Sequence, residues 1–100
     1  PTKGCVGVFH PTSLLFSGVS VESEQRAIGA SNNQYKGGTN APTGEVIFAP
    51  RNADAIGIFD AETSSFSTFS IKNDISTNRK FDGCATASNG LVVFAPENAD

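Results

Sequence analysis

The chain contains the stretch GGTNAPTGEVIFAPRNAD at residues 37–54, and it repeats this stretch as GCATASNGLVVFAPENAD at residues 83–100. Counted without gaps, ten of the eighteen positions are identical, at a spacing of 46 residues. A shorter echo links VGVF at 6–9 to IGIF at 56–59. Periods of about 20–50 residues are typical of arrays in which each unit buries its apolar face against its neighbours. The repeat therefore predicts the architecture of the chain.

Short β-prone runs separated by turn residues predict that this architecture is all-β. The runs are rich in Val, Ile and Phe or in small residues, and they occupy 5–10, 16–21, 45–49, 55–60, 66–71, 80–86 and 91–95. Gly, Pro, Asn, Asp and Ser bound them, as such residues bound strands. The stretch RNAD at 51–54 is expected to be a tight hairpin connection. The only candidate helix, 20–30, has no apolar stripe.

Residues that recur between the repeats indicate the core. Gly37, Gly38 and Gly83 suit strands whose backbones pack closely together. We expect the core between or within the units to hold the phenylalanines whose repeat partners are also Phe, namely Phe48, Phe59, Phe66 and Phe94.

The unit APTGEVIFAPRNADAIGIFDAET at 41–63 resembles β-propeller repeats of the form GGxxAPNGx[IV][YF]xPxNAxx[IV]x[IV][FI]DxxT. Such repeats are similar to those of kelch, NHL and YVTN-type propellers and are abundant in algal and other protist sequences. The resemblance covers nearly the whole chain and implies blades of four antiparallel strands, A to D from the inside. The first repeat departs from the pattern, with HP at 10–11 for DA at 60–61 and LL at 14–15 for SS at 64–65. This divergence suggests a terminal or specialised blade.

The resemblance places about two blade equivalents on the chain in a split register. Residues 1–34 are expected to form strands C and D of the first, divergent repeat plus a loop. Residues 35–79 form a complete four-stranded blade, and residues 80–100 form strands A and B of the following repeat.

This register leaves a B strand near Leu91–Ala95 and a C strand near Val6–Phe9 without partners. Open apolar edges invite pairing with other strands. We expect further blades of a longer chain or other protein chains to complete them. A homo-oligomer is the alternative, because dimers, trimers or tetramers would supply four, six or eight blades.

Six polar residues are candidates for ligand or partner loops: Asn52, Asp54, Asn98, Asp100, Asp60 and His10. The recurring Asn and Asp residues could bind cations or sugar hydroxyls through oxygen ligands. The favoured interpretation is that they, and Asp60, stabilise their own turns. His10 is the only histidine, and an exposed position is favoured over a general base because no triad order surrounds it.

Several classes of site and partner are not expected. Cys5 and Cys84 align with Ala55 and Gly38, so we expect free buried thiols rather than a disulfide, and no zinc spacing or other cofactor motif occurs. A net charge of −3 argues against nucleic acid as a partner. No apolar run approaches the roughly 20 residues of a membrane-spanning helix. We expect a soluble protein without a targeting segment in these residues, and its compartment stays open.

Two functional classes remain. The first is a noncatalytic interaction module, a propeller-type subunit or scaffold within a larger assembly, which rests on analogy between folds. The alternative is a carbohydrate-binding propeller, which the absence of Trp and the single tyrosine, Tyr35, disfavour. An enzyme ranks third, since a single histidine cannot supply the acids, histidines or metals that propeller enzymes gather.

Overall fold

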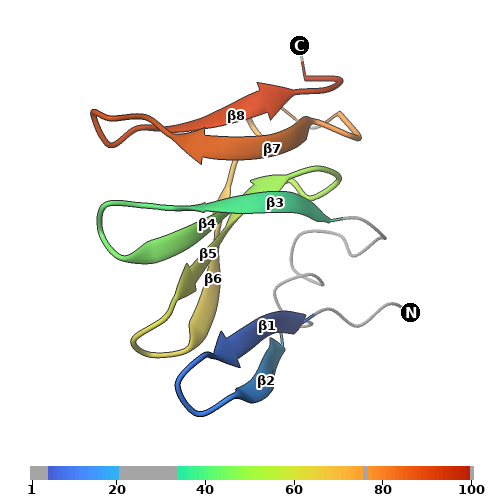
Figure 1. Cartoon of the computed structure of the whole chain (residues 1–100). Coiled ribbons are helices and arrows are strands. Elements are labelled where there is room, and N and C mark those ends of the chain that lie inside the picture. Colours follow the sequence, from blue (N-terminus) through green and yellow to red (C-terminus); the bar gives the residue numbers. More distant parts are fainter. Residues whose placement is uncertain (1–4, 21–33, 76, 100) are drawn as a thin grey trace.

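The computed structural model describes residues 5–20, 34–75 and 77–99. Within these ranges it contains strands and no helix, so the all-β prediction is confirmed. The strands are β1 (Cys5–His10), β2 (Leu15–Ser20), β3 (Tyr35–Asn40), β4 (Glu45–Pro50), β5 (Ala55–Asp60), β6 (Ser65–Ser70), β7 (Phe81–Thr86) and β8 (Val92–Pro96) (Figure 1). The stretch 20–30, which the sequence offered as its only candidate helix, lies outside the described residues except for Ser20, the last residue of β2.

The strands form three antiparallel sheets. A central sheet has the order β3-β4-β5-β6, and two hairpins, β1–β2 and β7–β8, lie on either side of it (Figure 1). Strand β7 packs against β3 and β4, and β2 lies beside β6. The resulting array measures 43 × 38 × 18 Å, and its described sheets do not close on one another.

The two hairpins repeat the two halves of the central sheet in register. In β1–β2, Phe9 lies opposite Phe16, as Phe59 lies opposite Phe66 in β5–β6, and every other Cα pair shifts by the same 50 residues. In β7–β8, each pair lies 46 residues after its equivalent in β3–β4, and both hairpins carry an irregularity at the same place. The central sheet therefore contains one copy of each hairpin, joined through β4 and β5.

The β3 and β7 backbones approach closely where glycines recur. A Cβ atom built on Gly37 would lie 3.5 Å from Cα of Gly83, which is an ordinary van der Waals contact, and one built on Gly83 would meet nothing within 4 Å, so the predicted crowding is not what requires glycine here. The hydroxyls of Thr39 and Thr86 are 3.0 Å apart nearby. Both glycines have positive φ, 72° and 125°, which other residues adopt only with strain.

Aromatic side chains gather on the opposite face of the central sheet. The rings of Tyr35, Phe48 and Phe66 lie 5.9–6.3 Å apart between centroids. Phe59, which is 5% exposed, belongs to the core as expected. Phe48, Phe66 and Phe94 are only half-buried, so the expectation holds for them in part, because their face of the sheet is incompletely covered.

The hairpin that the sequence predicted around the connection at residues 51–54 is confirmed, because β4 and β5 pair antiparallel on either side of this connection. Two of its amides, those of Arg51 and Ala53, donate to the carbonyl of Gln34, at 2.8 and 3.2 Å. The equivalent amides of Glu97 and Ala99 donate to Lys80 in the same way. Each connection is thus bound to the carbonyl of the residue just before the first strand of its own repeat.

Candidate functional site

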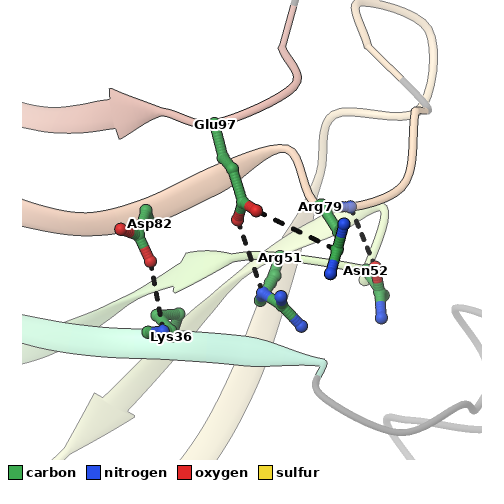
Figure 2. Close-up of polar contacts among 6 residues, drawn as sticks. All are labelled: Lys36, Arg51, Asn52, Arg79, Asp82 and Glu97. Carbon is green, nitrogen blue, oxygen red and sulfur yellow. Dashed lines mark hydrogen bonds and ion pairs between the residues drawn. The ribbon is translucent and has the colours of Figure 1, made fainter.

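Asn52 and Asp54, two of the predicted loop residues, bind the segment that leads into β7. Oδ1 of Asn52 accepts a hydrogen bond of 2.9 Å from the amide of Arg79 (Figure 2). Oδ1 of Asp54 lies 2.9 Å from Nζ of Lys80, whose side chain is fully buried and also donates to the carbonyl of Asn52 at 3.4 Å. Both contacts reach outside the 51–54 turn, which the favoured interpretation did not predict, because their partners lie in the segment that leads into β7.

Ion pairs continue this contact between the central sheet and the β7–β8 hairpin. Glu97 lies between two guanidinium groups, with Oε1 3.6 Å from Nε of Arg51 and Oε2 3.9 Å from Nε of Arg79 (Figure 2). Lys36 and Asp82 form a pair at 3.2 Å in which both side chains are more than half exposed. Exposed pairs of this kind contribute little stability. Each of these three cations lies within 4 Å of a carboxylate oxygen, and the two arginines share Glu97.

The remaining predicted residues do not come together. Asp60 stabilises its own turn, as favoured, because Oδ1 accepts the amides of Glu62 and Thr63 at 3.0 and 3.4 Å. His10 is exposed at the end of β1, and its carbonyl accepts the amide of Leu14. Asn98 is exposed, and its backbone amide donates a hydrogen bond of 2.8 Å to the carbonyl of Arg79. Asp100 lies outside the described residues.

A shallow pocket of about 380 Å³ lies where the β3–β4 and β5–β6 turns meet, lined by Thr43, Gly44, Glu45, Asp60 and Glu62. Sequence reasoning identified only Asp60 here. The register of β4 and β5, which sets Glu45 opposite Asp60, is the signal that was missed. Thr43 and Glu45 already bond one another, at 3.0 Å. Among the described residues, no group of three or more His, Cys, Asp or Glu side chains has the arrangement to hold a metal ion.

Cys84 is a partly buried thiol at the packing surface of β7. Its Sγ donates to the carbonyl of Ile47 at 3.6 Å, and the residue forms no disulfide. Burial raises the pKa of the Cys84 thiol above its ordinary value. Cys84 is thus a free thiol, as expected, and it is only partly buried. The side chain of Cys5 lies outside the described part of the chain.

Exposed apolar side chains gather on the two hairpins. Six large apolar residues are more than half exposed there: Phe9, Leu14, Leu15, Phe16, Leu91 and Val93. The equivalents of two of them, in the central sheet, are buried. Phe9 is 58% exposed and its equivalent Phe59 only 5%, while Val93 is 55% exposed and its equivalent Ile47 only 9%.

The same hairpins carry open strand edges. Within the described residues, β1 pairs only with β2 and β8 only with β7, whereas their equivalents β5 and β4 pair with each other. Among the described residues, the β1 and β8 edges, with the apolar side chains beside them, are the two surfaces best suited to bind another molecule. We call these two surfaces the open edges.

No helix within the described ranges is long and apolar enough to cross a membrane. Comparison of the chain with protein-family models, with curated proteins and with solved structures gave no match.

Proposed function

We propose that this chain is a noncatalytic, propeller-type interaction module that joins a larger protein assembly through its open edges. The observation that carries the proposal is the contrast in exposure between equivalent residues. Phe9 and Val93 are more than half exposed, and the residues that match them in the central sheet are buried. Burial of large apolar side chains is favourable, so a complex in which a partner completes the sheets and covers these side chains would be stabilised.

The mode of binding that fits these edges is strand addition. An unpaired strand offers a row of amides and carbonyls to an incoming strand, and side chains on its two faces supply specificity. The central sheet supports this proposal, because it holds the same two hairpins with their edges paired. The polar candidates support it too, since Asn52, Asp54 and Asp60 bind the chain itself.

A lysine placed on the β8 edge tests the proposal. Val93→Lys adds a charge to an edge strand, which discourages pairing. We expect partner chains that co-purify with the wild-type protein from a native extract to be lost with this variant. Ala61→Lys, which makes the same charge change in an exposed turn, is the matched control and should retain them. Equal recovery of the same chains with Val93→Lys would contradict the proposal.

Carbohydrate binding is the second candidate, and the pocket between the turns favours it. Carboxylates of Glu45, Asp60 and Glu62 line this pocket and could accept hydrogen bonds from sugar hydroxyls. No aromatic side chain lines it, although sugars commonly stack on aromatic rings. A glycan array tests this candidate directly. Binding that Glu62→Gln abolishes would support it, whereas binding that survives this change would exclude the pocket as its site.

A further inference from the structure

We infer that the free edge of β8 accepts β1 from a second copy of this chain, so that β7–β8 and β1–β2 build a second four-stranded sheet. The inference rests on the proposed function and names the partner of the open edges. It follows from the repeat: β7–β8 has the register of β3–β4, and β1–β2 has the register of β5–β6. Each hairpin is the missing half of the other.

The pairing of β4 with β5 gives the register between the two copies. Val46 lies opposite Phe59, and Phe48 lies opposite Gly57. Shifting each residue to its equivalent places Val92 of one copy opposite Phe9 of the other, and Phe94 opposite Gly7. Val93 then meets Val8, and Leu91 meets His10. In this register the exposed Phe9 becomes the counterpart of the buried Phe59.

Packing over Gly7 explains why the two hairpins match. In the central sheet, a Cβ atom on Gly57 would lie 2.9 Å from the Phe66 ring and 3.2 Å from Cβ of Phe48, so both phenylalanines pack over this glycine. A Cβ atom built on Gly7 would lie 3.0 Å from the Phe16 ring, so Phe16 already packs over this glycine. The second phenylalanine is absent from this position in the isolated hairpin.

Phe94 on β8 supplies that second phenylalanine. It already packs against Phe81, with the two ring centroids 5.4 Å apart. This pair is the equivalent of the Tyr35–Phe48 pair in the central sheet. Adding Phe16 from the other copy would rebuild the three-ring cluster that the central sheet makes from Tyr35, Phe48 and Phe66. One copy thus contributes two rings and the other copy the third.

Charge also favours this pairing. In the central sheet Glu45 lies directly opposite Asp60, and like charges at opposed positions destabilise a sheet. The equivalent pair between copies is Leu91 with His10, which carries no such repulsion. The two edges lie on opposite sides of the central sheet, so β1 of the same copy does not reach β8 and a β1 that pairs with it belongs to a second copy (Figure 1).

The first test is the association of the full chain, measured by sedimentation equilibrium. We expect the wild-type protein to be larger than its 10.4 kDa monomer and to dissociate on dilution. Phe16→Ser should weaken this association at least about tenfold, the scale expected for an aromatic side chain that anchors an interface. Phe16 is 73% exposed in one copy, so its replacement should leave the monomer folded.

Phe69→Ser is the matched control. Phe69 is 63% exposed, also lies in the second strand of a hairpin, and points to the opposite face from Phe66, the equivalent of Phe16. The Phe69→Ser substitution should therefore leave the association of the copies unchanged. A wild-type protein that stays monomeric, or equal weakening by both substitutions, would overturn the inference.

A disulfide between copies tests the register. Both chains carry Cys5→Ala and Cys84→Ser, so that only the introduced thiols react. One chain has His10→Cys and the other has Leu91→Cys. Mixing them under mild oxidation should give a cross-linked pair of unlike chains. Val8→Cys mixed with Leu91→Cys is the control, because Val8 lies about 6.8 Å further along β1 and the diagonal Cα distance exceeds the roughly 7 Å limit for a bridge.

The outcomes separate this inference from the proposed function. Cross-linking between the His10→Cys and Leu91→Cys chains above that of the control mixture supports the second copy as partner. Equal cross-linking in both mixtures, or none, overturns it. If the chain is monomeric while Val93→Lys still removes a captured protein, the open edges bind a different chain: the proposed function stands and the inference fails.

Discussion

At the scale of the residue, Lys80 shows how one repeat holds the next. Its ammonium group is removed from solvent and is bound by the carboxylate of Asp54 and the carbonyl of Asn52. A buried ammonium is costly unless it is paired and hydrogen-bonded, so this contact depends on both partners. The recurrence of Asn and Asp indicated a structural role, but not its target. That target lies 26 residues after Asp54 in sequence, and only the path of β5 and β6 brings it back.

Removal of the Asp54 carboxylate should destabilise the protein strongly. We expect Asp54→Ala to lower the free energy of unfolding by about 3–5 kcal/mol, since it leaves a buried charge without its partner. This is more than the modest effect expected from a turn residue. Urea denaturation followed by circular dichroism measures it. Lys80→Met in the same chain removes the stranded charge and should recover much of the loss; failure to recover would show that the ion pair is not the cause.

At the scale of the element, the β1–β2 hairpin and the equivalent β5–β6 pair share a contact between a glycine and a phenylalanine across the strands. Gly57 lies beneath the rings of Phe48 and Phe66, and Gly7 lies beneath Phe16. Glycine weakens a strand by itself, but an aromatic ring that packs across it restores side-chain contact. The contact therefore links a small-residue position in one strand to an aromatic position in the next.

Gly57→Ala should disturb the central sheet more than Gly7→Ala disturbs the β1–β2 hairpin. The methyl group that Gly57→Ala adds would meet two phenylalanines, and overpacking of this kind costs about 1–3 kcal/mol. The ring of Phe16 is largely exposed and can move away from the methyl group that Gly7→Ala adds. Thermal denaturation of both variants at low protein concentration compares them, and an equal loss of stability would contradict this account.

The strands themselves could be predicted well from sequence. The runs predicted at 5–10 and 55–60 have the same bounds as β1 and β5, because alternation of Val, Ile and Phe with glycine is a local signal. The irregularity between Tyr35 and Gly38 was not predicted, nor was the capture of the 51–54 connection by Gln34. Both depend on contacts between segments that lie apart in the sequence, which the pattern within one strand does not contain.

At the scale of the whole molecule, the described residues form three sheets in one array, and of these three the central sheet alone contains both kinds of hairpin. The substitution of Leu14 and Leu15 for the serines of the next repeat was visible in the sequence as a divergence. The exposure of these two leucines in the β1–β2 hairpin could not be predicted from the sequence, because exposure depends on which segments lie beside the turn. The same holds for the pocket, which forms where two turns meet.

If copies associate through their open edges, the melting temperature of the wild-type protein should rise with concentration. Binding that occurs only in the folded state stabilises that state by mass action. A hundredfold increase in concentration is expected to raise the melting temperature by several degrees for a chain of this size. Calorimetry of the wild-type protein and of Phe16→Ser makes the comparison, and the variant should show little dependence. Identical behaviour of the two proteins would argue against association through this edge.

The difference between the two hairpins gives any such association a direction. Each copy has one end that donates β1 and one that receives it, as a monomer in a condensation polymer has two unlike end groups. Contacts between unlike surfaces close into a ring only when the rotation between neighbours divides a full turn, and otherwise continue as a filament. A copy that carries Val93→Lys can still donate β1 but cannot receive it, so it would act as a chain stopper. The ratio of stopper to wild-type chain would then set the mean length of an open polymer, whereas a closed ring that forms before mixing would not respond to it.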